Sequence, residues 1–482
     1  MNQHEKLLVR CEEEPGTHPH CPHGPMLYFY KTSSLKEGFF ACSAFRDKNS
    51  CGYHTNLKEL SDSHKKRRYP METYDYKKLR RKIKSVPVEN RNYCHTCNLP
   101  YVHLEANVHS DHNTLQGITD EKFLNPTSFL KPIDNDKVEA QYFFDEKSLK
   151  VFTSLLDKCD IRKVVCIGTP RLHAYLQKNK GHTDSFLLDF DHRYFYFYDD
   201  DQFAWYNMCN NHFFDEKQRT FFEKFLTLED EDDDENLALF IDPPFGCRTE
   251  VVANSIKQLT ALYRSKNKLH KMPTVFWVYP YFGESYIRQV MPEMEMCDYK
   301  INYTNHESYS DGSKGRKLGS PVRLFSNVPQ NLIVLPTAEG YKFCQPCNRW
   351  TSKENTHCTI CSDCPSKNGD TYRHCMECKT CVKPNYVHCK DCRRCTQKGE
   401  HNCAEYQARI RCWICREVGH NEYNCRALQL YKTKKKLHSN LCLICRQPKP
   451  HNEKSCPKRK QYIVEHSFMG QSTLKFKKRH RK

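Results

Sequence analysis

The residues best suited to chemistry form the turn Asp242-Pro243-Pro244-Phe245, which directly follows the apolar run Leu237–Ile241. The Asp242 carboxylate and the Pro243 carbonyl accept hydrogen bonds, and proline has no N–H, so the turn presents only acceptors. The ring of Phe245 can stack on a base extruded from its helix. Such a turn can bind both hydrogens of a planar amine and draw its nitrogen toward the tetrahedral geometry of a nucleophile.

This turn matches the tetrapeptide [DNS]PP[FYW] of enzymes that methylate exocyclic or amide nitrogens. The amino group of adenine is a poor nucleophile because its lone pair is delocalised into the ring. The methyl donor would be S-adenosylmethionine. Gly168 would let the backbone approach the amino-acid end of this cofactor, and an acidic residue after the next strand would bind its ribose hydroxyls. Asp189 is the first candidate for that acidic residue, and Asp191 is its rival.

The segments around these residues predict an α/β fold with a parallel sheet. Amphipathic stretches such as Glu146–Cys159 and Thr249–Tyr263 alternate with short apolar runs, a pattern typical of parallel strands covered by helices on both faces. The runs are Val164–Ile167, Phe186–Leu188, Leu237–Ile241 and Thr274–Val278. Ligands bind such sheets at the carboxyl ends of the strands. We therefore expect the residues that follow the first three runs, Gly168, Asp189 and Asp242, to meet at one edge.

Cysteine and histidine are frequent and occur at metal-ligand spacings. The 482 residues include 29 Cys and 25 His, and the N-terminal residues do not suggest secretion, so we expect the cysteines to ligate metal rather than to form disulfides. Zinc takes about four nitrogen or sulfur ligands and stabilises modules with too little core of their own. The N-terminal part offers two sets, Cys21, His23, Cys42 and Cys51, then Cys94, Cys97, His109 and His112, with His95 and His103 as rivals in the second set.

A denser array of ligands begins at Cys344. One Cys-x2-Cys pair, three His-Cys-x2-Cys-x2-Cys repeats and a final His and Cys are enough for three or four interleaved sites. Two zinc knuckles follow, the second stretched by one residue, and this motif is typical of single-stranded RNA binding. The array contains Cys344, Cys347, His357, Cys358, Cys361, Cys364, His374, Cys375, Cys378, Cys381, His388, Cys389, Cys392, Cys395, His401 and Cys403; the knuckles contain Cys412, Cys415, His420 and Cys425, then Cys442, Cys445, His451 and Cys456.

The charge of the chain favours a nucleic-acid partner. There are 76 Lys and Arg against 58 Asp and Glu, a formal net charge of +18. The basic segment His64–Lys84 would bind phosphate, direct nuclear import or serve as a solvated linker, and the basic tail Lys475–Lys482 would bind phosphate or direct nuclear import. The acidic run Glu229–Glu235 is interpreted as a solvated loop, with autoinhibition of a basic groove as the alternative. No apolar run approaches the roughly 18 residues that cross a bilayer.

Other cysteines lack metal-ligand spacing. Five lie in the middle of the chain, mostly among apolar residues, and are interpreted as packing residues: Cys159, Cys166, Cys209, Cys247 and Cys297. Cys11 lies outside every set and stays unassigned.

The order of these modules resembles one known family over nearly the whole chain. The first ligand set, with its strand Gly38-Phe39-Phe40-Ala41, resembles a GRF-type zinc finger, and the start of the array is similar to the cysteine-rich domain of DHHC palmitoyltransferases. A GRF finger, a C2H2 finger, the Asp242–Phe245 motif, a DHHC-like cluster and a CCHC knuckle occur in this order in the CCHC-finger rRNA N6-adenosine methyltransferases, which methylate one adenosine of large-subunit ribosomal RNA.

The resemblance implies a Rossmann-like class I methyltransferase core flanked by N-terminal GRF and C2H2 zinc fingers and a C-terminal DHHC-like/CCHC zinc array. The acidic run and the second knuckle depart from the family pattern. The expected segments are a GRF-type finger at 1–60, a basic linker at 61–90, a C2H2-like finger at 91–135, the methyltransferase domain at 136–340, the DHHC-like cluster at 341–405, the knuckles at 406–460 and a basic tail at 461–482.

The resemblance also assigns roles to residues. The catalytic motif would be Asp242, Pro243, Pro244 and Phe245, and the contacts to S-adenosylmethionine would be Gln141, Ile167, Gly168, Thr169, Pro170, Arg171, Asp189 and Asp242. Counting 23 Cys and nine His ligands, at four per ion, gives about eight zinc ions. The implied partner is ribosomal RNA and not a membrane, with ribosome-associated or RNA-helicase proteins as further candidates. The implied location is the nucleolus and the cytoplasm.

Two hypotheses of different classes follow. In the first, the protein methylates N6 of an adenosine in ribosomal RNA, zinc modules position the RNA, and the modification supports ribosome biogenesis and translation. DNA adenine or protein glutamine methylation is the runner-up within the enzyme class. In the second, the protein is a zinc-rich, RNA-binding ribosome-assembly scaffold with an inactive methyltransferase fold. The intact Asp242–Phe245 turn favours the enzyme, because an inactive relic has little use for it.

Overall fold

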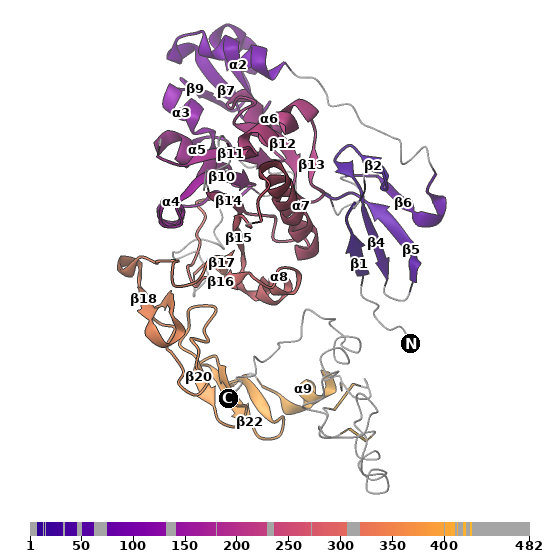
Figure 1. The fold of residues 1–482 in the computed structure, drawn as a ribbon, viewed down its shortest axis with the longest axis vertical. Helices are drawn as coiled ribbons and strands as arrows, with labels where there is room; N and C mark the ends of the chain where they lie inside the picture. Colours follow the sequence, from indigo (N-terminus) through magenta and orange to yellow (C-terminus); the bar gives the residue numbers. More distant parts are fainter. Residues whose placement is uncertain are drawn as a thin grey trace. The chain divides into compact units, whose positions relative to one another are not determined.

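A computed structural model of the chain contains two compact units (Figure 1). The larger unit runs from Leu7 to Lys353, and Glu354 begins the other. Within the described residues, no helix is both long enough and apolar enough to span a lipid bilayer. The structure describes residues 7–12, 14, 16–31, 34–45, 51–61, 75–131, 141–179, 181–228, 236–270, 272–305, 319–399, 401–409, 412, 418–420 and 425–426.

The larger unit is built around an eight-stranded sheet with the order β13-β12-β11-β10-β14-β15-β17-β16. The five strands from β12 to β15 in this order are parallel, and the pairs that involve β13, β17 and β16 are antiparallel. Each expected apolar run lies in one of the parallel strands, so the predicted α/β fold is confirmed in its core. The strands are β10 (Ile161–Ile167), β11 (Asp184–Asp189), β12 (Phe203–Asn207), β13 (His212–Phe213), β14 (Asn236–Ile241), β15 (Thr274–Pro280), β16 (Glu295–Met296) and β17 (Val322–Ser326).

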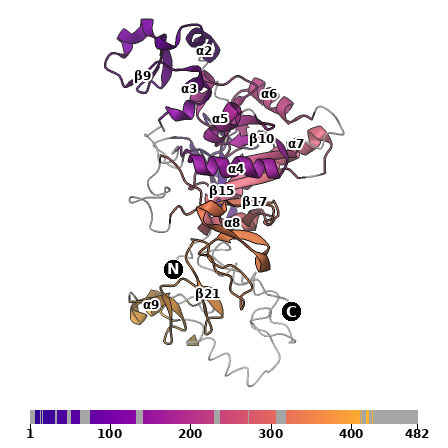
Figure 2. The same ribbon diagram turned by 90° about the vertical axis from the view of Figure 1, so that its left-hand side faces the viewer.

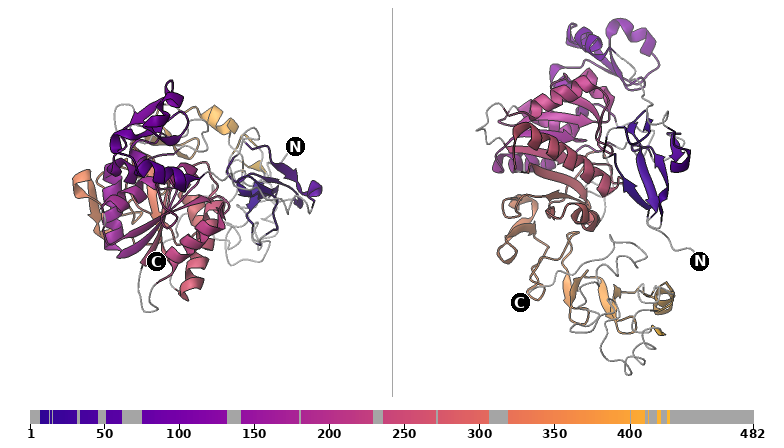
Figure 3. Two further views of the ribbon diagram at one scale, coloured as in Figure 1. Left: turned by 90° about the horizontal axis from the view of Figure 1, so that it is seen from above. Right: turned by 45° about the vertical axis from the view of Figure 1, so that its right-hand side comes forward.

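Helices cover both faces of this sheet, as the amphipathic pattern predicts. Alternate residues of β10 point to opposite faces, so Val164 packs in one apolar cluster and Val165 in the other. The first cluster includes Phe152 of α4 (Glu146–Lys158) and residues of α5 (Pro170–Asn179), and Figure 2 shows α4 along this face. The second cluster includes residues of α6 (Glu216–Leu226), α7 (Thr249–Asn267) and α8 (Glu284–Val290), and Figure 3 shows the magenta and dark red helices beside the sheet.

Two small β modules precede the central sheet. In the first, the sheet order is β1-β4-β5-β6 and β2 pairs with β3. Its core of six buried residues contains three cysteines, Cys21, Cys42 and Cys51. The stability of this module therefore depends on the group that binds these three thiols. The strands are β1 (Leu7–Arg10), β2 (His20–Cys21), β3 (Gly24–Pro25), β4 (Leu27–Lys31), β5 (Ser34–Ala41) and β6 (His54–Asn56), followed by the 3-10 helix η1 (Leu57–Glu59).

The second module has the sheet order β8-β7-β9 and lies beside the helix α2. Its residues Tyr93 and Ile118 belong to the same apolar cluster as the core of the central sheet. The elements are α2 (Tyr76–Lys84), η2 (Val88–Asn90), β7 (Arg91–Cys94), β8 (Leu99–Val102), η3 (His103–His109), β9 (Thr114–Gln116), α3 (Asp120–Leu124) and η4 (Pro126–Ser128).

The remaining elements are short. Three antiparallel hairpins are β18 (Tyr341–Cys344) with β19 (Arg349–Ser352), β20 (Arg373–Cys375) with β21 (Thr380–Val382), and β22 (Tyr386–Cys389) with β23 (Arg394–Gln397). The other elements are the helix α9 (Cys403–Arg409) and the 3-10 helices η5 (His192–Tyr196), η6 (Tyr281–Gly283), η8 (Thr337–Glu339) and η9 (Gln345–Cys347).

Helix α2 forms within the segment that the sequence analysis treats as a basic linker, and one of its cations is buried. The Arg80 guanidinium donates to the carbonyl oxygens of Phe195, at 3.3 Å, and Tyr198, and it pairs with Asp199. The next residue, Arg81, is exposed. Arg80 therefore anchors α2 to the segment that follows β11 and cannot bind phosphate there, whereas residues 64–74 of the basic segment lie outside the described residues.

We predict that Arg80→Ala lowers the free energy of unfolding of the full chain by about 2–3 kcal/mol, because it leaves buried carbonyl acceptors without a donor. Arg81→Ala is the matched control and should change this free energy by less than about 0.5 kcal/mol. Urea denaturation in zinc-containing buffer measures both. Equal effects of the two substitutions would contradict the structural role of Arg80.

Candidate active site and metal centres

Three strand ends form the candidate active site. Strand β10 lies between β11 and β14, so Gly168, Asp189 and Asp242 come to the same edge of the sheet. The backbone joins them there: Gly168 N–H donates to Leu188 O at 2.9 Å, and Asp242 N–H donates to Ile167 O at 3.1 Å. The structure thus brings together the residues that the sequence analysis places at this edge.

At Gly168 the backbone lies very close to the segments that carry Asp242 and Met208. Its φ is +65°, a left-handed conformation that favours glycine. A Cβ atom at this position would lie 2.6 Å from Met208 Cε and 3.0 Å from the carbonyl oxygen of Asp242. A side chain would therefore separate the two loops that carry the candidate cofactor and catalytic residues.

The Asp242 carboxylate faces a tyrosine that the sequence analysis does not identify. Tyr303 Oη donates to Asp242 Oδ1 at 3.1 Å and to Oδ2 at 3.0 Å. Desolvation raises the pKa of Asp242 well above its ordinary value, and the Tyr303 hydrogen bond opposes this by stabilising the carboxylate. Tyr303 lies 61 residues away in the sequence, so no local pattern could have assigned it.

Aromatic rings surround Phe245. Its ring centroid lies 5.9 Å from Tyr279, 6.2 Å from Tyr142 and 6.4 Å from Tyr303. Tyr279 Oη also donates to the carbonyl oxygens of Phe245, at 3.1 Å, and Cys247, at 3.2 Å, which fixes the turn. Phe245 is only half-buried, so a planar group has access to this aromatic wall.

The two acidic residues after β11 have different surroundings. Asp189 is buried and accepts the Asp191 N–H at 2.9 Å; burial and the nearby Asp191 charge raise the pKa of Asp189 to about 7. Burial also opposes ionisation of Asp191, but the charge and hydrogen bonds of Arg193 outweigh it and hold the pKa of Asp191 below its ordinary value. Gln141 Nε2 donates to Asp191 Oδ2 at 2.8 Å. Gln141 therefore contacts Asp191, the rival of Asp189.

The other residues assigned to the cofactor lie on the same segment as Gly168. Ile167 and Thr169 are buried, and α5 begins at Pro170. Arg171 Nη1 donates to Thr304 Oγ1 at 3.0 Å, next to Tyr303. This contact links the start of α5 to the segment that reaches Asp242.

The first module holds its predicted ligands together and is bound to this edge. Cys21, His23, Cys42 and Cys51 form a group that could hold a metal ion, with His23 Nδ1 at 3.8 Å from Cys21 Sγ and 3.4 Å from Cys42 Sγ. Bond lengths of about 2.0–2.3 Å in a tetrahedron separate ligand atoms by roughly 3.3–3.8 Å, so zinc fits.

Two asparagines, one that ends β12 and one that follows it, bind this module. Asn207 Nδ2 donates to His23 O and to Ser43 Oγ, both at 2.9 Å. Asn210 Nδ2 donates to His23 O at 3.0 Å and to Pro25 O at 2.8 Å. These asparagines flank Met208, the residue that meets Gly168, so the metal-binding loop contacts the segment that lines the candidate active site.

The second module groups Cys94, Cys97, His109 and His112. The sulfur of Cys97 lies 3.6 Å from His109 Nδ1 and 3.3 Å from His112 Nδ1, and the two Nδ1 atoms are 3.3 Å apart. These separations fit a zinc tetrahedron. The structure brings His109 and His112 to the cysteines, and the rivals His95 and His103 are not part of this group.

The C-terminal array is interleaved, as its repeats suggest. Two groups that could hold a metal ion are Cys358, Cys361, His374 and Cys381, and Cys375, Cys378, His388 and Cys395. Cys389, Cys392, His401 and Cys403 also converge, with His401 Nε2 at 3.2 Å from both Cys392 Sγ and Cys403 Sγ. His357 Nδ1 lies 4.0 Å from Cys364 Sγ, and Cys344 and Cys347 lie at the turn of the first hairpin.

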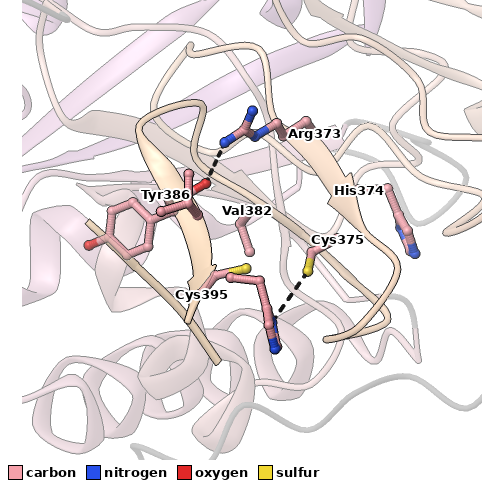
Figure 4. A pocket seen from close by; sticks show the side chains of 8 residues that line it. Arg373, His374, Cys375, Val382, Tyr386 and Cys395 are labelled. Carbon is pink, nitrogen blue, oxygen red and sulfur yellow. Dashed lines mark hydrogen bonds between the residues drawn. The ribbon is translucent and has the colours of Figure 1, made fainter. Parts of the chain in front are cut away.

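A pocket of about 250 Å³ borders the second of these groups (Figure 4). Its lining includes Arg373, whose Nη2 donates to Tyr386 O at 2.7 Å, and Cys375, whose sulfur lies 3.7 Å from His388 Nδ1. The pocket thus consists largely of the ligands and of the two hairpins that carry them.

The remaining predicted ligands are only partly within the described residues. Cys412, His420 and Cys425 of the first knuckle are described, and both cysteines are buried. Cys415, the knuckle of Cys442, Cys445, His451 and Cys456, the acidic run and the basic tail lie outside the described residues.

The five middle cysteines all pack in or against apolar clusters, as predicted, although two of them are not fully buried. Cys166, Cys209 and Cys297 are buried, whereas Cys159 and Cys247 are partly exposed. Cys11 is partly buried and packs against the apolar cluster of Leu27, Cys209 and Val251.

Comparison with known proteins decides the family. Residues 135–328 match the family model described as probable N6-adenine methyltransferase. The chain is 39% identical to the human rRNA N(6)-adenosine-methyltransferase ZCCHC4 over 362 residues. This alignment covers 71% of this chain and 70% of the human protein. The chain belongs to the ZCCHC4 family. Its Xenopus laevis member is 37% identical over 371 residues, covering 73% of this chain and 74% of that one, and the Bos taurus member is 36% identical over 374 residues.

Family membership implies S-adenosylmethionine as the cofactor, and the residues present fit it. The Gly168 turn leaves space that a Cβ atom would fill, and the buried Asp189 carboxylate ends the adjacent strand. Gln141, Gly168, Asp189 and Asp191 are the residues that would hold it. The contacts that sequence reasoning missed, from Tyr303, Met208, Asn207 and Arg193, all come from segments that meet only in the folded ZCCHC4-like core.

We predict that Gly168→Ala weakens binding of S-adenosylmethionine by at least about tenfold, because a Cβ in the left-handed region is strained and would press against the Asp242 carbonyl. Gly181→Ala is the control, since a Cβ there meets nothing within 4 Å. Isothermal titration calorimetry measures both. Unchanged affinity in Gly168→Ala would remove this turn from the cofactor site.

Proposed function

We propose that this protein is an S-adenosylmethionine-dependent enzyme that methylates N6 of an adenosine in large-subunit ribosomal RNA. The acceptor-only turn Asp242–Phe245, beside the Gly168 turn in a chain of the ZCCHC4 family, is the observation that carries the proposal. The adenosine must leave its helix, because the turn lies at the edge of a sheet and its aromatic wall admits only an unstacked base.

The chain's own residues orient the amine. The Asp242 carboxylate accepts one N6 hydrogen and the Pro243 carbonyl accepts the other, so the nitrogen lone pair is freed from the ring and directed at the methyl group. S-adenosylmethionine, when bound, supplies that methyl group in electrophilic form. Phe245 stacks on the base, with Tyr142 and Tyr279 excluding water around it. After methyl transfer N6 carries a positive charge and loses one proton to solvent water, so this mechanism needs no separate general base.

The zinc modules would position the RNA. The first module corresponds to a GRF-type finger and the second to a C2H2-like finger, and both join the methyltransferase core through hydrogen bonds or a shared apolar cluster. The DHHC-like array and the CCHC knuckles would also bind RNA, with zinc as the structural metal in each. A protein with this substrate would act in the nucleolus and the cytoplasm, where it supports ribosome biogenesis and translation.

The direct test of the substrate is mass spectrometry of ribosomal RNA nucleosides. Cells that lack the protein should lose N6-methyladenosine from their large-subunit rRNA, and the wild-type gene should restore it. An unchanged level would favour the scaffold hypothesis.

We predict that Asp242→Ala abolishes transfer of a labelled methyl group to rRNA, by at least about a hundredfold, because the turn loses one of its two acceptors for the amine. RNA affinity should stay within about twofold of the wild type, since a single carboxylate at the reacting centre adds little to a polyanion interface. Asp157→Ala, on the exposed side of α4, is the control. Wild-type transfer by Asp242→Ala would refute the catalytic assignment.

The Tyr303 hydroxyl should shape the pH profile of methyl transfer. Its hydrogen bond lowers the pKa of Asp242, so Tyr303→Phe should raise that pKa and move the acid limb of kcat/KM to higher pH. The same variant should lose about threefold to tenfold in rate on the plateau, the effect of one hydrogen bond. Tyr299→Phe is the matched control, because Tyr299 Oη contacts Glu339 instead. An acid limb that stays in place would show that Tyr303 does not act on Asp242.

A further inference from the structure

Arg193 is a buried cation that joins four segments of the larger unit. Its side chain is 2% exposed. Nη1 donates to Asn98 Oδ1 and to Lys131 O, both at 3.0 Å. Nη2 donates to Asp191 Oδ2 at 2.7 Å and to Gln141 Oε1 at 3.2 Å, and Nε donates to both Asp191 oxygens at 3.0 Å. Nη1 of the guanidinium therefore binds one pair of residues, Asn98 and Lys131. Nε and Nη2 bind another pair, Asp191 and Gln141.

The partners divide into two groups. Asp191 and Gln141 lie on the cofactor side, next to Asp189. Asn98 and Lys131 belong to the second zinc module, in which Asn98 directly follows the ligand Cys97 and has a φ of +56°. Because a guanidinium is planar and rigid, a shift of Asn98 would move the atoms that hold Asp191 and Gln141.

The orientation of Gln141 depends on this arrangement. Its Oε1 accepts from Arg193 while its Nε2 donates to Asp191, so the amide has one orientation in which both bonds form. Its backbone carbonyl accepts from Asn305 Nδ2 at 2.7 Å, close to Tyr303. The Gln141 side chain is thus fixed by Arg193 and Asp191, and its backbone by the segment that reaches the catalytic turn.

We propose that Arg193 is a positioning residue through which the second zinc module sets the affinity of the cofactor site. The proposal rests on the proposed function, since it takes Gln141 and the acidic residues after β11 as cofactor contacts. The ordered zinc loop fixes Asn98, Asn98 and Lys131 fix the guanidinium, and the guanidinium fixes Asp191 and Gln141. The module then serves the cofactor as well as the RNA.

The decisive variant removes the Asn98 side chain and keeps the backbone. Asn98→Gly is suitable because glycine adopts a φ of +56° without strain. Asn348→Gly is the matched control: Asn348 follows the ligand Cys347 in the same way, has a φ of +49°, and within the described residues its side chain makes no hydrogen bond to the central sheet. Arg193→Lys tests the centre of the network, because lysine keeps the charge but has a single amine.

The measurement is calorimetric binding of S-adenosylhomocysteine to the full zinc-loaded chain, with zinc content determined for each variant. We expect the Kd to rise about fivefold to tenfold in Asn98→Gly, at unchanged stoichiometry, and at least as much in Arg193→Lys. Asn348→Gly should stay within twofold of the wild type. In methyl transfer, Asn98→Gly should raise the KM for S-adenosylmethionine and leave kcat and the Kd for an rRNA transcript within twofold.

Other outcomes overturn the proposal. A Kd for S-adenosylhomocysteine within twofold of the wild type in both Asn98→Gly and Arg193→Lys would show that the network does not position the cofactor site. A reduced stoichiometry with unchanged Kd would show that the variants only lose folded protein. Wild-type protein that binds S-adenosylhomocysteine but methylates no rRNA would refute the proposed substrate alone, and the Kd comparison would still decide the role of Arg193.

Discussion

The position of β10 between β11 and β14 is the constraint on which the site depends. Residues Val164–Ile167 pair in parallel register with both neighbours, so Ile167 lies opposite Leu188 on one side and Ile241 on the other. Strands in this register end together, and the turns that follow them share one edge. Gly168 then permits the Asp242 carbonyl to lie where a side chain would stand. The chemistry of the turn is therefore built on a backbone packing requirement.

The two N-terminal modules are attached to the loops that leave this edge. The end of β12 and the loop after it bind the first module through Asn207 and Asn210, and the loop after β11 binds the second through Arg193. The first module has a thin core in which three of six buried residues are cysteines, so metal binding would be part of its folding, whereas the second module shares the apolar cluster of the central sheet. In the larger unit, the metal-binding loops of the two modules thus support the segments after β11 and β12, which line the candidate active site.

The sequence was sufficient for features set by local patterns and insufficient for those set by tertiary contacts. Continuous apolar runs identified β10, β11, β14 and β15 because buried parallel strands need apolar residues on both faces. Ligand spacing identified the metal groups because a chelate places its ligands within a short loop. Tyr303 and Arg193 could not be identified, since their partners are distant in the chain. The burial of Arg80 was not predicted, because the many charges of this segment suggested a solvated linker. The apolar residues Tyr76, Leu79 and Ile83 have the spacing of one helix face and could have indicated α2.

The interleaving of the C-terminal array makes neighbouring metal sites mechanically dependent. His374 belongs to one group and the next residue, Cys375, to the following group; His388 and Cys389 repeat this arrangement one hairpin later. Adjacent candidate metal groups are thus linked by a single peptide unit, about 3.8 Å between Cα atoms. Loss of the metal ion from one group would therefore also disturb the neighbouring group, because consecutive residues are ligands of different groups.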